Sequence, residues 1–405
     1  MSRVWLVASA ACLCIASSAH AQTVLTLEET VARARERAAS VAVARARVAE
    51  SEAALLDPSA RFRENPLVSG GLGPRSGDFE RTTDVELSVS QLFETGGQRK
   101  ARLAGATAAI DRQKADVEQT AREAVFEAAS AFLDGLAAIE RVSVAQDADS
   151  VSRQLLTAAE RRFAAGDIAA IDVNLARIDA ARSAAVLRGS RADLQAVEDR
   201  IRSILRLPAN EPLELRGSLD PPPAPALEQL EAAVAQRPEF AALAADAREA
   251  EAQTQLGRAL GKPDLGLSAS YSREGPDTIV LGGLTATLPL FHRGQGTLAA
   301  GLARGSRVRL EAELARERAV RDVRAAYRVY TQRAELVAAL TKDALPSVAD
   351  NESLAQRSYD AGEINLMDML LIRRDAVDAR TAVIERRLDA ARSRLVVDFA
   401  AGVLR

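Results

Sequence analysis

The chain has 405 residues, of which 48% are hydrophobic, 27% are charged and only 3% are aromatic. Its formal net charge of −3 excludes the basic excess typical of nucleic-acid binding, and its two cysteines exclude a disulfide scaffold or a cysteine-rich zinc protein. The remaining composition, rich in Ala, Arg, Leu, Val and Glu, favours long helices over a mixed fold.

Residues 1–21 are predicted to form a cleaved signal peptide. Arg3 provides the positive charge, residues 4–15 form an apolar stretch too short to span a bilayer, and residues 19–21 (AHA) match a cleavage site. An uncleaved N-terminal membrane anchor is the alternative. Cleavage would leave a mature chain without Cys or Trp and with a single histidine, His292.

The rest of the chain contains an internal duplication. Residues 91–98 (QLFETGGQ) align with 289–296, residues 162–168 (RFAAGDI) align with 358–364, and residues 50–53 align with 249–252, in the same order and at nearly the same offset. Chance matching within an Ala-rich sequence is the alternative. A proline cluster at 221–225 marks the junction, so we expect a first repeat at 22–220 and a second at 221–405.

Each half predicts the same order of elements. An amphipathic helix (27–56 and 226–260) precedes a Gly- and Pro-punctuated segment with strands (57–95 and 262–293). A long helix (98–163 and 296–360) and a returning helix (to 205, and 363–403) follow. Thr26 and Glu29 form a capping-box pattern, and Pro346 predicts a kink.

The long helices must bury their apolar stripes against one another. A helix over 98–163 would be roughly 100 Å long, which is too long for an ordinary globular domain. In the last helix, apolar residues recur at spacings of three, four and seven, as in a coiled-coil seam. These residues are Leu370, Val377, Ile384, Leu388, Ala391 and Leu395. We interpret the stripe as helix packing and not as a ligand site.

The strand segments carry an alternating pattern. In residues 83–93, Val85, Leu87 and Val89 alternate with polar residues, and residues 284–290 repeat the pattern. Shorter partner strands are expected at 67–72 and 265–271, joined through loops containing Gly73, Gly77, Gly275 and Pro276. About ten alternating residues is the length of a tilted transmembrane strand. Aromatic residues at the strand ends (Phe93, Tyr271 and Phe291) suit a membrane interface.

A small soluble sheet is the alternative interpretation of these strands. Two hairpins supply four strands, and four strands cannot close a barrel. Membrane insertion would therefore require several chains that each donate four strands.

Together these features resemble the outer-membrane efflux family, also called the TolC family, over essentially the whole mature chain. The resemblance rests on the duplication, on residues 65–68 (NPLV) and 263–265 (PDL) before the hairpins, and on QLF at 91–93 and PLF at 289–291. Residues 96–102 (GGQRKAR) look most like the CzcC-type heavy-metal-efflux branch.

The resemblance implies a mainly α fold with a transmembrane β-barrel: a homotrimer whose 12-stranded barrel contacts outer-membrane lipid above a periplasmic helical tunnel. It also implies an equatorial band at about 206–226 and the extreme C-terminus. Its members are passive exit ducts without cofactors. They receive cargo from an inner-membrane pump, of the resistance-nodulation-division (RND) type, through a periplasmic membrane-fusion adaptor.

The resemblance also assigns the ends of the helical hairpins. Gly166 and Gly362 match the hairpin tips that contact the adaptor, and glycine suits a left-handed turn between antiparallel helices. Tyr359 matches the family's tip aromatic, and Phe163 is its repeat counterpart. We expect all four residues at the adaptor-contact tips.

The periplasmic gate is expected six residues beyond each glycine, at Asp172 and Asp368. Asp368 matches an entrance-gate aspartate of the family, where a three-fold carboxylate ring would concentrate cations and make passage salt-sensitive. A second gate aspartate is replaced by Leu371, which argues against a double acidic ring. For Asp172, a solvated helix face is an equal alternative.

No metal site is expected. Met367 and Met369 lie beside the proposed gate, and thioethers suit Cu(I), but filling gaps in a helical seam is the favoured interpretation. His292 stands alone between a strand and a helix, without a partner at ligand spacing.

Two other functional classes fit the sequence less well. An enzyme is disfavoured because the mature chain has one His, no Cys nucleophile and no phosphate-binding loop. A periplasmic coiled-coil adaptor or scaffold would not need the duplicated alternating hairpins. We therefore expect an outer-membrane efflux duct for heavy-metal cations, with a multidrug or type I secretion duct as the alternative cargo class.

Overall fold

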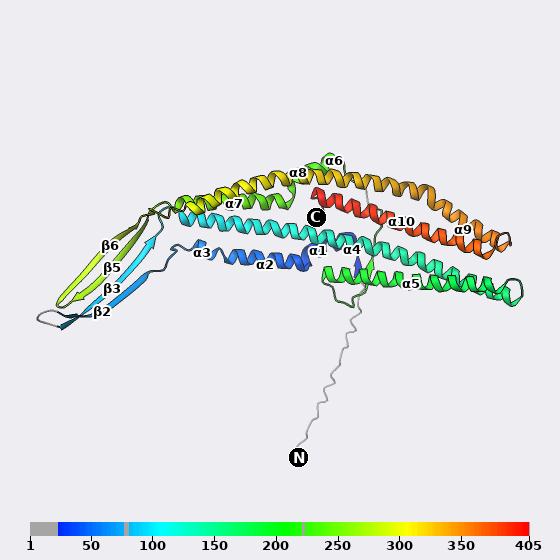
Figure 1. The fold of residues 1–405 in the computed structure, drawn as a ribbon, viewed down its shortest axis with the longest axis horizontal. Helices are drawn as coiled ribbons and strands as arrows, with labels where there is room; N and C mark the ends of the chain where they lie inside the picture. The colour runs from blue at the N-terminus through cyan, green and yellow to red at the C-terminus, as the bar shows by residue number, and fades with distance from the viewer. Residues whose placement is uncertain (1–22, 77–80, 221–222, 405) are drawn as a thin grey trace, which may run out of the picture.

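The computed structural model describes residues 23–76, 81–220 and 223–404, so the predicted signal peptide and part of the proline cluster lie outside the described residues. The protein is an elongated, gently curved body with a β-sheet at one end and helical hairpin turns at the other (Figure 1). The C-terminus lies near the middle of the body (Figure 1).

The first predicted helix is broken into three. α1 (Leu27–Arg37), α2 (Ala39–Ala53) and α3 (Leu56–Ser59) replace the continuous helix expected at 27–56. The capping box is confirmed, because Thr26 Oγ1 accepts from the Glu29 N–H at 3.2 Å and Glu29 Oε2 accepts from the Thr26 N–H at 3.0 Å. The break falls at Ala38, whose extended backbone (φ −54°, ψ 140°) separates α1, which packs against α4 and α5, from α2, which packs against α4.

The four expected strands form one antiparallel sheet in the order β2-β3-β5-β6. Their bounds are β2 (Leu67–Ser76), β3 (Arg81–Phe93), β5 (Asp264–Glu274) and β6 (Asp277–Thr287). The partner strands are longer than expected, and Gly73 lies within β2 instead of in a loop. The expected turn at Gly275 is confirmed, with a φ of +62°.

The expectation that the last strand includes Leu288 and Leu290 is wrong, because β6 ends at Thr287. Pro289 lacks the backbone N–H that a strand needs for ladder pairing, which explains the early end.

The two faces of the sheet differ in polarity. Directly paired residues point to the same side, and the register places Val89 opposite Val68 and Ala269, and Leu87 opposite Tyr271. The opposite face carries Ser69, Ser88 and Ser270 in one row. The alternation predicted from the sequence therefore separates a mainly apolar face from a mainly polar one, with Ile279 and Leu281 of β6 on the polar face and Arg273 of β5 on the apolar face.

Long helices form the remainder of the body. In the first half, α4 (Gln98–Ala164) runs unbroken for 67 residues, roughly 100 Å, and α5 (Ala170–Leu205) returns beside it. In the second half, α6 (Leu227–Ala233), the 3₁₀ turn η1 (Val234–Gln236) and α7 (Pro238–Ala259) precede the sheet. The single helix expected at 226–260 is thus interrupted before Pro238, which begins α7.

The second long helix contains the expected irregularity. α8 (Gln295–Ala339) leads through a π-helical turn, η2 (Leu340–Ala344), into α9 (Leu345–Asp360), and α10 (Leu366–Ala401) returns. Pro346 lies just after the π turn, where its missing N–H cannot complete the ordinary helical hydrogen-bond ladder.

The main core lies at the middle of the body. There β1 (Thr23–Leu25) pairs in parallel with β4 (Leu213–Leu215), so the segment after α5 folds back onto the start of α1. Arg387 of α10 donates two hydrogen bonds to the Asp220 carboxylate (3.0 and 2.7 Å) and one to Glu140 of α4 (2.7 Å). The lower half of the coiled-coil seam differs, since Leu370 and Val377 are only partly buried. The buried residues of the central core include Leu25, Phe132, Leu136, Ile201, Leu205, Leu219, Ile384, Leu388, Ala391 and Leu395.

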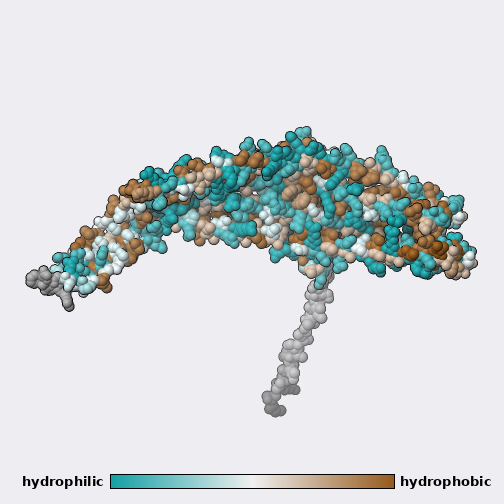
Figure 2. Space-filling model, in the orientation of Figure 1, coloured by the Kyte–Doolittle hydropathy of each residue, from teal (hydrophilic) through white to brown (hydrophobic). Residues whose placement is uncertain are grey.

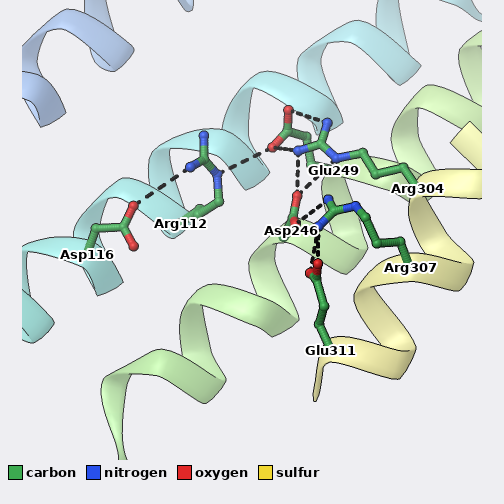
Figure 3. A network of polar contacts seen from close by, with 7 residues as sticks. All are labelled: Arg112, Asp116, Asp246, Glu249, Arg304, Arg307 and Glu311. Atoms are coloured by element: carbon green, nitrogen blue, oxygen red, sulfur yellow. Dashed lines mark hydrogen bonds and ion pairs between the residues drawn. The ribbon is translucent and has the colours of Figure 1, made fainter. Parts of the chain in front are cut away.

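Near the sheet, α4, α7 and α8 are joined by a network of charges (Figure 3). Arg304 of α8 donates to Glu249 of α7 at 2.9 Å and also contacts Asp246 of α7. Arg112 of α4 reaches the Glu249 carboxylate at 3.6 Å, so one carboxylate links three helices. The side chains of Asp246 and Glu249 are only 15% and 22% exposed, which makes these contacts stronger than ordinary surface ion pairs.

The same region needs glycine for close backbone approach. A Cβ on Gly257 of α7 would overlap the backbone of Leu298 in α8, and a Cβ on Gly301 of α8 would lie 2.6 Å from the Thr254 backbone nitrogen. Helices α7 and α8 therefore contact each other through their backbones at these two points.

We predict that Gly257→Ala lowers the free energy of unfolding by about 1–3 kcal/mol, because the new methyl group forces α7 and α8 apart. The matched control is Gly189→Ala in α5, where a Cβ would meet nothing within 4 Å. That control should be neutral or stabilising by up to about 1 kcal/mol, because alanine is the better helix former. Thermal unfolding followed by circular dichroism in detergent gives both values, and equal effects would contradict the close contact.

Candidate functional site

The two helical hairpins turn at the end of the body opposite the sheet (Figure 1). Gly166 and Gly362 have φ values of +83° and +76°, in the left-handed region that glycine adopts without strain. At the first turn, the Gly166 N–H donates to Phe163 O and the Asp167 N–H donates to Arg162 O, both at 2.9 Å. The second turn repeats this Schellman pattern, so the predicted turn positions are confirmed.

The two predicted gate aspartates occupy equivalent positions but make different contacts. The Asp172 carboxylate accepts a hydrogen bond from the Ala169 N–H at 3.2 Å and so caps the start of α5. At the start of α10, Asn365 Oδ1 takes the capping role and accepts from the Asp368 N–H at 2.9 Å. The exposed carboxylate of Asp368 is therefore not needed for the cap, whereas that of Asp172 is.

The two predicted tip aromatics also differ. Tyr359 is only 8% exposed, whereas Phe163 is 48% exposed. The Arg162 guanidinium lies 5.8 Å from the centre of the Tyr359 ring. Tyr359 thus packs the hairpins together and offers a partner little surface, while the side chain of Phe163 is accessible. Contact of either residue with an adaptor stays a prediction.

A small core joins the two hairpins just above their turns. Met369 is 1% exposed within this core, which confirms its packing role, but Met367 is 53% exposed and does not fill the seam. On the face drawn in Figure 2, several hydrophobic residues gather at this end of the body. The buried members of this tip core are Leu155, Ala159, Val173, Ala176, Ala355, Tyr359, Leu366 and Met369.

A cavity of about 260 Å³ lies between the tip core and the central core. It separates α5 from α10, which explains why the lower part of the predicted seam is only partly buried. Ser152 donates to Asp179 across the α4–α5 pair at 2.6 Å. Burial lowers the pKa of the Arg373 guanidinium, and the carboxylates of Glu352 and Asp179 oppose that shift. The charged residues around the cavity are Arg141, Asp179, Arg182, Arg373, Arg374 and Asp378.

The sequence pattern does not predict that these arginines share a cavity. Their only signal is the Arg373-Arg374 pair seven and eight residues after the start of α10, and arginine is common throughout the chain. Their positions mean that the hairpin end is not uniformly acidic, and that the Asp368 carboxylate lies on a helix that also carries the partly buried Arg373 and the exposed Arg374.

The described residues contain no group of three or more His, Cys, Asp or Glu side chains arranged to hold a metal ion. His292 is exposed in the connection between β6 and α8. None of the helices in the described ranges combines the length and the hydropathy needed to cross a membrane.

The comparisons with known proteins agree with this architecture. The cobalt-zinc-cadmium resistance protein CzcC of Cupriavidus metallidurans is 26% identical over 303 residues, covering 74% of this chain and 72% of CzcC. The nickel-cobalt-cadmium resistance protein NccC of Alcaligenes xylosoxydans xylosoxydans is also 26% identical, over 66% of this chain and 63% of NccC.

The fold is that of known outer-membrane channels. A solved structure of CusC, described in terms of folding and transmembrane channel formation, aligns with a TM-score of 0.76 and 15% identity over 93% of this chain and 91% of CusC. The outer-membrane channel OprN aligns with a TM-score of 0.73 and 19% identity over 93% of this chain and 89% of OprN. The family model described as outer membrane efflux protein matches residues 30–205 and 230–403, one match in each half. The protein therefore belongs to the outer membrane efflux protein family, with its sheet at the outer membrane and its long helices in the periplasm.

Proposed function

We propose that this protein is the exit duct of a heavy-metal efflux system. In this proposal three copies form a passive channel that receives cations from an inner-membrane RND pump through a periplasmic adaptor. Heavy-metal cations are proposed as the cargo because the chain is similar to CzcC and NccC, whose names record resistance to cobalt, zinc, cadmium and nickel. Nothing in the family match or in these names points to an enzyme.

The geometry supports an assembly of copies. In the described sheet, β2 and β6 each pair along only one side, so both edges offer backbone N–H and C=O groups to another chain. The helices next to the sheet also form an open layer, in which α4 packs on α7 and α7 packs on α8. Three such arrays would join edge to edge into a closed sheet of twelve strands above a ring of helices.

The hairpin end supports contact with an adaptor and a gate. Both Schellman turns are exposed, and Phe163 and Asp368 are accessible beside them. A carboxylate at the hairpin end would attract cations and repel anions when copies bring three of them together.

We predict that deleting the gene in its host lowers tolerance of cobalt, zinc, cadmium or nickel several-fold. This expectation follows from the names of the two relatives, CzcC and NccC. A plasmid copy of the gene should restore growth of the deletion strain. Minimal inhibitory concentrations of the four metals, measured beside those of a panel of drugs, test it. Unchanged metal tolerance with a loss of drug tolerance would favour the multidrug alternative.

We predict that Asp368→Asn reduces the potassium current of the purified channel in planar bilayers at low salt and has little effect at high salt. The reason is that a lost carboxylate no longer concentrates cations, and salt screens what remains. Folding should be unaffected, because the cap of α10 uses the backbone N–H of Asp368.

The matched control for this prediction is Glu228→Gln, the same loss of charge at an exposed position on α6. It should leave the current unchanged at both salt concentrations. If neither substitution changes the current, the assignment of Asp368 to the gate is contradicted.

A further inference from the structure

The polar face of the sheet has an uneven charge distribution. Arg75 is the one basic residue that the pairing register places on this face of the described strands. Its guanidinium donates to Asp84 Oδ2 at 2.9 Å and to Glu274 Oε2 at 2.6 Å. One cation thus holds two carboxylates near the end of the sheet farthest from the helices.

Glu86 lies on the same face, one row closer to the helices. Its direct partners across the sheet are Gly71 and Ser272, and neither carries a charge. The side chain of Glu86 is exposed. Arg75 pairs with Asp84 and Glu274, and none of the ion pairs among the described residues includes Glu86.

The row of Glu86 ends in Ile279 of β6, and the next row toward the helices combines three serines with Leu281 of β6. Ser69 and Ser88 share a hydrogen bond at 2.7 Å, Ser88 lies opposite Ser270, and Ser90 lies opposite Ser268. The space beside two glycines is already filled: a Cβ on Gly266 would overlap the Thr285 hydroxyl, and a Cβ on Gly283 would overlap the Ser268 hydroxyl. Glu86 is therefore the one charged side chain in its row of the described sheet and in the next two rows toward the helices, while Asp277 lies opposite Glu274 at the far end of the same face.

The polar face must line the duct if the apolar face contacts lipid, since uncompensated carboxylates do not face hydrocarbon. We propose that Glu86, with one carboxylate from each copy, makes the sheet end of the duct selective for cations. Arg75 limits that selectivity by neutralising Asp84 and Glu274. The inference rests on the proposed duct and adds a specificity-determining residue at the end opposite Asp368.

The test is the potassium-to-chloride permeability ratio of the purified assembly, obtained from reversal potentials across a KCl gradient in planar bilayers. The dilute side is held at ~10 mM salt, where the electrostatic screening length is about 30 Å. Glu86→Gln should lower the ratio roughly twofold or more, and Arg75→Gln should raise it, because two carboxylates lose their partner. Both effects should disappear at ~1 M salt, where the electrostatic screening length is about 3 Å.

Each substitution is also measured in an Asp368→Asn background, so that a carboxylate at the far end cannot mask the effect. Glu228→Gln on α6 controls for the change in total charge. Far-ultraviolet circular dichroism and the high-salt conductance verify that each variant is folded and inserted. If Arg75→Gln fails to fold, Glu86→Gln alone decides, because its side chain is exposed and bridges nothing on the sheet.

The outcomes separate this inference from the proposed function. A conducting wild-type channel whose permeability ratio is unchanged by Glu86→Gln in both backgrounds overturns the role of Glu86 and leaves the duct intact. A purified protein that forms no channel overturns the duct and this inference together.

Discussion

The unpaired edges of the sheet are the constraint on which the rest of the structure depends. Strands β2 and β6 each leave one row of backbone groups without a partner in the described part of the chain. In hydrocarbon, where no water can substitute, each unsatisfied N–H or C=O costs several kcal/mol. A sheet with one apolar face is therefore stable in a membrane only when other chains complete it. The open layer of helices next to the sheet would likewise be completed by the helices of other copies.

Duplication supplied two similar halves, and their contacts have diverged. Asp172 caps its own helix, whereas Asn365 performs that task in the second half and leaves the Asp368 carboxylate free. Phe163 is accessible, whereas Tyr359 holds the hairpins together. Helix α4 is continuous, whereas its counterpart contains the π turn η2. The first half therefore has the more regular hairpin, and the second half carries both the irregular helix and the free carboxylate.

Much of the architecture could be predicted because its signals are local. Glycine at a left-handed turn, a capping box and strict alternation in strands each follow from backbone geometry. The break at Ala38 could not be predicted, since alanine favours helix and the local sequence carries no breaking residue. Burial of Tyr359 and exposure of Met367 depend on how two hairpins meet, which the spacing of residues within one helix does not determine. Glu86 could not be singled out from the sequence, because only the strand register shows that its direct partners, Gly71 and Ser272, carry no charge.

The central claim is that three copies close one barrel. Its most direct test is the mass of the protein extracted from the outer membrane in mild detergent, determined by light scattering with correction for bound detergent. The account predicts a particle of three chains, whose combined sheets contribute four strands each. A monomer released without detergent would contradict it and would favour a periplasmic coiled-coil scaffold.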